Sequence, residues 1–196
     1  GTAKILESLG VDVVISGGQT MNPSTADILA AVNKVNADSV VILPNNKNII
    51  MAAQACVEVS EKPCAVVATT SVPQAFSALF GLDEDASLEE NVEAMTEAYA
   101  DVRTGEVTRA IKDAKDAHDN PIREGDVIGI ADGSIEAVGS AVEDVVMDLL
   151  ARMDADEADT LTLLAGEDLD DAALGALVAR IEEAYDELEI DAHRGE

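Results

Sequence analysis

The chain has 196 residues, 47% of them hydrophobic, which is enough to bury a substantial core in one domain or in two small ones. Its formal net charge of −28 sets 12 Lys and Arg against 40 Asp and Glu. A surface this acidic repels phosphate backbones and anionic lipid, and no apolar run approaches the roughly 20 residues of a membrane span. We therefore expect no nucleic-acid binding and no membrane insertion. The charge instead suits solubility or a basic partner.

The first part of the chain repeats one pattern, in which a short apolar run is followed by a polar loop and then by a helical pattern. The apolar runs are rich in β-branched residues, which indicates buried strands. Strands that alternate with helices pair in parallel, so we expect the exit loops to emerge at one edge of a sheet that has helices on its faces. The three expected strands are Val11–Ile15, Ser39–Leu43 and Pro63–Ala68.

Helices are expected before, between and after these strands. The first, Gly1–Leu9, has no strand before it and ends at Gly10, which suits a helix C-terminus. This beginning suggests a fragment of a longer protein. The later helices keep apolar residues on one face, and Ser87 with Glu90 fits a capping box that opens the last of them. They are one that follows Ser24, then Ile49–Val59, Pro73–Phe80 and Leu88–Val102.

The pattern changes at about Gly105, where alternation replaces helical spacing. Asp132-Gly133 lies between two apolar runs and is a strong hairpin signal, so we expect an antiparallel meander followed by a helix and a second parallel unit. The expected strands are Gly105–Ala114, Val127–Ala131, Ser134–Val138, Thr160–Leu164 and Glu187–Ala192. We therefore predict an α/β protein with a mostly parallel sheet flanked by helices. Its lobes are a crevice lobe at 1–103 and a meander lobe at 104–196, as two domains or as one compact domain.

Uncharged polar residues follow each of the first three expected strands, where open α/β sheets bind their ligands. Gly17 and Gly18 permit close backbone approach, and the helix that begins near Ser24 offers its positive end to an anion. Lys47 could pair with a phosphate or with a partner carboxylate. The alternative is that these residues only form turns and cap helices. The candidate ligand- or partner-binding residues are Gly17, Gly18, Gln19, Thr20, Asn22, Ser24, Asn45, Asn46, Lys47, Asn48, Thr70, Ser71 and Gln74.

Histidine and cysteine often take part in catalysis or metal binding, but here we interpret these residues as structural or as partner contacts. His193 lies at the end of the last expected strand and is taken as a structural or partner-contact residue. Cys56 and Cys64 fit small core residues of a reduced, cytoplasmic protein. Met51, Met95 and Met147 lie on helical faces and are expected in the core. No spacing indicates a catalytic Ser/His/Asp or Cys/His arrangement or a metal site.

Several ordered blocks of sequence resemble one protein family along essentially the whole chain. They are GGQTMNPST at Gly17–Thr25, LPNNKNIIMAA at Leu43–Ala53, SVPQAFSAL at Ser71–Leu79, LEENVEAM at Leu88–Met95, GDVIGIADG at Gly125–Gly133 and GED at Gly166–Asp168. Together they resemble the C-terminal region of the ATP-binding subunit of bacterial fatty acid kinase. Such proteins are dihydroxyacetone kinase-like and are also called "DAK phosphatase" family members.

The resemblance implies a fold similar to the DegV and dihydroxyacetone-kinase substrate-subunit superfamily. It implies a parent kinase that phosphorylates fatty acids for phospholipid synthesis and whose N-terminal domain holds ATP and Mg²⁺. No cofactor is then expected in this fragment, nor catalysis by the fragment alone. The implied partners are a DegV-like fatty-acid-binding protein and the parent's own kinase and middle domains, and a homodimer stays open.

Three functional hypotheses follow. The leading one is a docking domain that holds the fatty-acid carrier so that the separate kinase domain can phosphorylate the fatty acid. The second is a small-molecule site in which the strand-end crevice binds a phosphate or a carboxylate directly. The third is a vestigial crevice in a domain that serves assembly.

Overall fold

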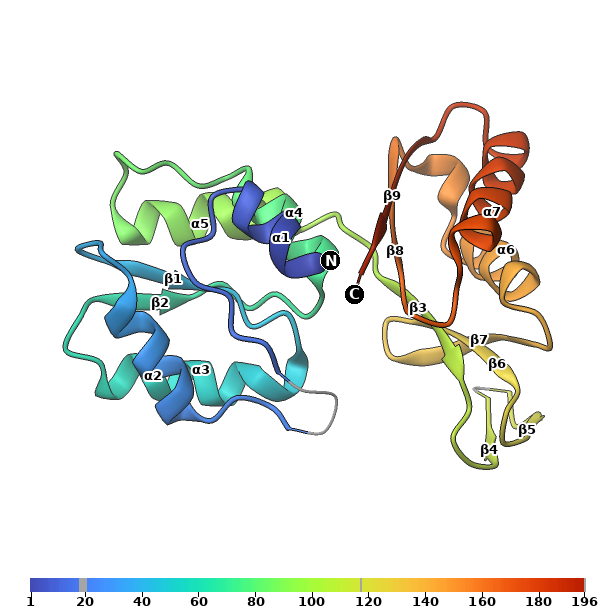
Figure 1. Cartoon of the computed structure of the whole chain (residues 1–196), viewed down its shortest axis with the longest axis horizontal. Coiled ribbons are helices and arrows are strands. Elements are labelled where there is room, and N and C mark those ends of the chain that lie inside the picture. Colours follow the sequence, from blue (N-terminus) through green and yellow to red (C-terminus); the bar gives the residue numbers. More distant parts are fainter. Residues whose placement is uncertain (18–20, 117, 196) are drawn as a thin grey trace. The chain divides into compact units, whose positions relative to one another are not determined.

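The computed structural model describes residues 1–17, 21–116 and 118–195, and the chain divides into two compact units, Gly1–Val102 and Arg103–Glu196 (Figure 1). We call them unit 1 and unit 2. None of the helices formed by the described residues combines the length and the apolar character that crossing a lipid bilayer requires.

Unit 1 is a three-layer arrangement around a short parallel sheet. Its two strands pair in register from Val40 opposite Cys64 to Ile42 opposite Val66. Alternate side chains of these strands pack against α2 and α3 on one face and against α4 and α5 on the other (Figure 1). The elements are α1 (Thr2–Ser8), α2 (Thr25–Lys34), β1 (Val40–Ile42), α3 (Lys47–Val59), β2 (Cys64–Val66), α4 (Val72–Leu79) and α5 (Leu88–Tyr99).

The predicted strand at Val11–Ile15 is wrong. This segment has no strand structure, and the only partner of β1 in the described residues is β2. The Val11 amide donates to the carbonyl of Leu6, which closes the end of α1, and the Ile15 side chain is 39% exposed. An apolar run becomes a strand only where another strand can pair with it, and no strand among the described residues pairs with this one. The glycine that ends α1 is confirmed, because Gly10 has a φ of +97°.

The cysteines behave as the composition predicts. Cys56 and Cys64 are free and buried, and both belong to the core between β1, β2, α2 and α3. Burial, and then the neighbouring Cys64, raise the pKa of the Cys56 thiol. A neutral, buried thiol acts as a small apolar residue.

Unit 2 begins with an antiparallel meander in the spatial order β3-β6-β7. Its hairpin is confirmed, because Asp132 and Gly133 have φ of 51° and 85° and together form the two-residue turn between β6 and β7. Gly129 of β6 permits the close packing of α6, since a Cβ there would lie 3.1 Å from Val145. These elements are β3 (Gly105–Arg109), β6 (Val127–Ala131), β7 (Ser134–Gly139) and α6 (Val142–Arg152).

The expected strand Gly105–Ala114 ends early, at Arg109. The chain then leaves the meander as residues 110–126, which we call the arm, and returns into β6. Two backbone hydrogen bonds close its base, from the Ala110 amide to the Asp126 carbonyl and from the Gly125 amide to the Ala110 carbonyl. Within the arm, β4 (Ala114–Lys115) pairs with β5 (Pro121–Ile122).

The second parallel unit is confirmed. Strands β8 (Thr160–Ala165) and β9 (Glu189–Arg194) pair in parallel around α7 (Asp171–Ala184), after the short helix η1 (Ala155–Glu157). Apolar residues of α6 and α7 cover one face of this sheet. The last strand is predicted to end at Ala192, but β9 continues through His193 and Arg194, because these two residues pair with Leu164 and Ala165.

Candidate functional site

The exit loops of β1 and β2 meet at one edge of the unit 1 sheet, as parallel pairing requires. A pair of hydrogen bonds ties them together. The Thr69 hydroxyl donates to Asn45 Oδ1 at 2.7 Å, and the Asn45 amide donates to Thr69 Oγ1 at 3.2 Å. Thr69 is fully buried, and Asn45 has a φ of +58°. We call this pair the Asn45–Thr69 clamp, and it fixes the path of both loops.

Four of the predicted polar residues in these two loops form local hydrogen bonds at the starts of α3 and α4. Asn46 Oδ1 accepts from the Asn48 amide at 2.8 Å and caps α3. Ser71 Oγ accepts from the Gln74 amide at 3.3 Å and caps α4. Gln74 Oε1 accepts in turn from the amide and the hydroxyl of Thr70, at 2.7 and 3.0 Å. The capping interpretation therefore accounts for each of these hydrogen bonds.

The segment that leads into α2 also uses a predicted polar residue to cap a helix. Ser24 and Asp27 form a capping box at α2, with the Asp27 amide 3.2 Å from Ser24 Oγ and the Ser24 amide 2.8 Å from Asp27 Oδ2. The hydrogen bond from the Ser24 hydroxyl, and then that from its amide, lower the pKa of Asp27. Gly17 and Asn22 are exposed. The predicted binding residues Gly18, Gln19 and Thr20 lie outside the described residues.

The side chains of α3 that are open to solvent at this edge include those of Lys47, Asn48 and Met51. Lys47 forms no ion pair with any described residue. Met51, expected in the core, is 80% exposed, because it lies about 200° around the helix from the buried Ala53. Lys47 and Met51 are four residues apart and so lie on the same side of α3. We call Lys47, Asn48 and Met51 the α3 edge.

His193 belongs to unit 2 and has a local partner. Its Nε2 lies 2.7 Å from Oδ2 of Asp191, two residues earlier on β9, and its side chain is 34% exposed. Alternate residues of a strand point to one face, which brings the pair together. Its bonded partner is thus a carboxylate of its own strand.

Two shallow hollows in the described surface lie away from the strand-end loops. One, of about 430 Å³, lies at the end of α2, where Lys62 Nζ donates to the carbonyls of Val32 and Val35 at 3.2 and 2.5 Å. The other, of about 350 Å³, is lined in part by Arg103, Arg152 and Asp154. Across the described ranges, no three His, Cys, Asp or Glu side chains gather as a metal site would require.

Sequence reasoning missed two residues at this edge. Thr69 stands in a run of hydroxyl residues, and nothing in the run distinguishes the buried member from its neighbours. Met51 has the spacing of a core residue. The helix α3 is rich in apolar residues, but its fully buried residues are only Ala53 and Cys56.

Known proteins match the chain along its whole length. The family model for the C-terminal region of FakA-like fatty acid kinase proteins matches residues 1–196. Protein YloV of Bacillus subtilis strain 168 is 40% identical over 196 residues. The uncharacterized protein SAR1202 of Staphylococcus aureus strain MRSA252 is 37% identical over 195 residues. Each of these two relatives covers all of this chain with 35% of its own length, so the chain spans about a third of them.

Solved structures confirm the predicted fold class. The Streptococcus pneumoniae fatty acid kinase (Fak) B3 protein, loaded with linoleic acid, matches with a TM-score of 0.62 at 15% identity, covering 88% of this chain and 70% of that one. A DegV family protein from Eubacterium eligens, loaded with heptadecanoic acid, matches with a TM-score of 0.57 at 13% identity, covering 99% and 78%. The chain thus has a DegV-like fold, and it belongs to the family of FakA-like fatty acid kinase C-terminal domains.

Proposed function

We propose that this chain is the docking domain of a fatty acid kinase. It holds the fatty-acid-carrying subunit so that the kinase portion of the same polypeptide reaches the carboxyl group of the acid. Family membership supports this role, as does the 35% share of the relatives' length, which leaves room in them for a kinase. ATP and Mg²⁺ would be bound by that other portion, and the kinase and middle domains would be the chain's neighbours.

The α3 edge is the observation that carries the proposal. The clamp and the helix caps occupy most of the polar groups of the two exit loops, which leaves a poor cradle for a small anion. What the edge offers instead is a cation without an ion-pair partner among the described residues, beside a methionine that is 80% exposed. Methionine is enriched at protein interfaces because its flexible, polarizable side chain adapts to a partner. A cation on a chain of net charge −28 adds orientation to such a contact.

Calorimetric titration tests this role. The chain would be titrated with a fatty-acid-loaded DegV-family carrier from the same cell, at low and high salt. We expect saturable binding that weakens by about tenfold or more in Lys47→Glu and in Met51→Ser, as for residues central to an interface. Lys4→Glu is the matched control, because Lys4 is an exposed lysine of α1. Circular dichroism would establish that each variant is folded.

Two results would overturn the proposal. One is the absence of binding by the folded chain. The other is an equal loss in Lys47→Glu and Lys4→Glu, which would show that only the net charge matters.

A second candidate function rests on a different observation. The two solved structures named above are both described as loaded with a fatty acid, and here the loop that follows β2 holds the buried Thr69 hydroxyl. The chain itself could therefore bind a fatty carboxylate. Titration with linoleate alone, followed by native mass spectrometry, would favour this function if a complex forms and is lost in Thr69→Val.

A further inference from the structure

The sulfur-bearing side chains of this protein, five methionines and two cysteines, differ widely in exposure. Met51 is 80% exposed and Met21 is 77% exposed. Met95 is 1% exposed, and Met147 and Met153 are partly buried. Both cysteines are buried. A small reagent dissolved in water therefore meets sulfur mainly at Met21 and Met51.

Met51 lies where a change in polarity bears on the proposed docking role. It belongs to the α3 edge, four residues after Lys47 and therefore on the same side of the helix. The Thr25 hydroxyl donates to the Ala52 carbonyl at 3.4 Å, so the start of α2 is held against α3 next to Met51. The backbone at this point is fixed, while the thioether of Met51 stands in solvent.

We propose that Met51 is an oxidation site through which a peroxide weakens docking. This inference rests on the docking function proposed above. Hydrogen peroxide gives one oxygen atom to the thioether: a sulfur lone pair attacks one peroxide oxygen, the O–O bond breaks as the S–O bond forms, and the other oxygen leaves as water. The sulfur is oxidised to a sulfoxide and the peroxide is reduced. Methionine sulfoxide reductases reverse the change.

A sulfoxide changes both groups that the α3 edge offers to a partner. The S=O group is polar, so a flexible apolar contact is replaced by a group whose burial against a partner is costly. Its oxygen also accepts hydrogen bonds, and Lys47 is the neighbouring donor four residues earlier, with no ion-pair partner among the described residues. One added oxygen atom thus removes the apolar contact and engages the cation beside it.

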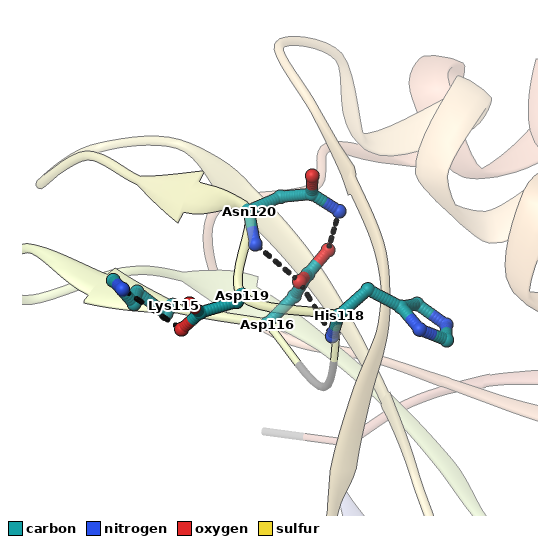
Figure 2. Close-up of polar contacts among 5 residues, drawn as sticks. All are labelled: Lys115, Asp116, His118, Asp119 and Asn120. Carbon is teal, nitrogen blue, oxygen red and sulfur yellow. Dashed lines mark hydrogen bonds and ion pairs between the residues drawn. The ribbon is translucent and has the colours of Figure 1, made fainter.

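The arm of unit 2 provides a sulfur-free reference on the same chain, because it contains neither methionine nor cysteine. Figure 2 shows that its polar side chains are bonded to one another and to the arm's own backbone. Asp116 accepts hydrogen bonds from the His118 amide and from the amide and side chain of Asn120, each at 2.8 Å. The Lys115 ammonium lies 2.8 Å from Asp119 Oδ1. Peptides from the arm should therefore keep their mass when the methionines gain oxygen.

Peptide mapping by mass spectrometry tests the site itself. The chain would be treated with increasing doses of hydrogen peroxide, and the fraction of each methionine that carries an extra oxygen would be measured relative to peptides from the arm. We expect Met51 and Met21 to oxidise several-fold faster than Met95, which is buried. If Met51 oxidises no faster than Met95, the proposal is overturned without any binding measurement.

Calorimetric titration tests the consequence for docking. The chain would be oxidised at a dose that leaves Met95 intact, freed of peroxide, and titrated with the fatty-acid-loaded DegV-family carrier. We expect oxidised wild type to bind about tenfold or more weakly than the untreated chain, and a methionine sulfoxide reductase to restore the affinity. Each variant is compared with its own untreated sample. Peroxide should weaken Met21→Leu as it weakens wild type, whereas it should leave the affinity of Met51→Leu unchanged.

The outcomes separate this inference from docking itself. If the untreated, folded chain does not bind the carrier, the docking role and its control by oxidation fail together. If the untreated chain binds and full oxidation of Met51 leaves the affinity unchanged, the inference fails and the docking role stands. A loss of affinity in peroxide-treated Met51→Leu equal to that of wild type would assign the effect to another residue and would also overturn the inference.

Discussion

Thr69 Oγ1 donates to Asn45 Oδ1 at 2.7 Å, so the loops that leave β1 and β2 behave as one piece. Asn45 stands at a φ of +58°, a left-handed conformation that asparagine adopts more readily than most other non-glycine residues. The clamp holds it there, because the fully buried Thr69 hydroxyl both donates to Asn45 and accepts from it.

Replacing Thr69 by Val should lower the free energy of unfolding by about 1–3 kcal/mol, because the Asn45 amide and side chain then lose their buried partner. Urea denaturation would measure it. Thr96→Val is the control, since Thr96 is exposed and its hydroxyl donates to the Val92 carbonyl of its own helix. In the double variant Thr69→Val/Asn45→Ala, the unfolding free energy should fall by less than the sum of the two single losses. We expect this difference to be about 0.5–3 kcal/mol. Additive losses would show that the two residues act separately.

Gly81→Ala and Gly175→Ala should change stability in opposite directions. A Cβ at Gly81 would lie 2.6 Å from the Ala94 carbonyl oxygen, so we expect a loss of about 1–3 kcal/mol as α4 and α5 are forced apart. A Cβ at Gly175 on α7 meets nothing within 4 Å, so alanine there should gain up to about 1 kcal/mol. Thermal unfolding of both variants would measure the contrast, and a neutral Gly81→Ala would contradict the close approach.

The capping box at α5 predicts a pH dependence. Hydrogen bonds from the Ser87 amide, and then from its hydroxyl, hold the pKa of Glu90 below its usual 4.5. A lowered folded-state pKa stabilises the fold above pH 4.5, and this gain is lost as the pH falls through the folded-state pKa. The stability difference between wild type and Glu90→Gln should therefore shrink on acidification below pH 4.5.

Urea denaturation across a pH series would follow that difference. Glu93→Gln serves as the control, because Glu93 belongs to the same helix and has no part in the cap. A difference that grows on acidification would contradict the cap.

Arg194 should control the loop between β8 and α7. Its guanidinium donates to the Leu169 carbonyl and lies 3.5 Å from Asp171 Oδ1. Arg194→Ala should therefore speed amide hydrogen exchange across residues 166–170, as measured by mass spectrometry. Asp171→Asn should have little effect, because the Asp171 side chain is 89% exposed and an exposed ion pair contributes little. Equal effects of both changes would show that the ion pair, and not the carbonyl contact, holds the loop.

Features encoded by a few consecutive residues could be predicted from the sequence. Ser24 and Ser87 cap their helices, and Asp132-Gly133 makes its hairpin turn. In each case the signal and the hydrogen bond that satisfies it lie within four residues. The parallel pairing of β1 with β2 and of β8 with β9 follows from alternation of strands and helices, which is also visible along the chain.

What depends on distant partners could not be predicted. Val11–Ile15 has the composition of a strand, and only the absence of a neighbour among the described residues decides against it. Thr69 bonds to a residue 24 positions earlier, whereas its neighbour Thr70 bonds to Gln74 four positions later, and the local sequence does not distinguish the two. The arm interrupts an alternating pattern that could have continued as β3. In each case tertiary context decides between conformations that the local sequence allows equally.

The boundary between the units falls once along the chain, between Val102 and Arg103. Each hydrophobic cluster accordingly draws its residues from one side of that boundary. During synthesis, all the residues of the hydrophobic clusters of unit 1 are available for packing once Val102 has left the ribosome. At about 5–20 residues per second, the ribosome needs on the order of 10 s more to complete unit 2. The newborn chain can therefore bury the apolar surface of its first half before the second half exists to compete for it.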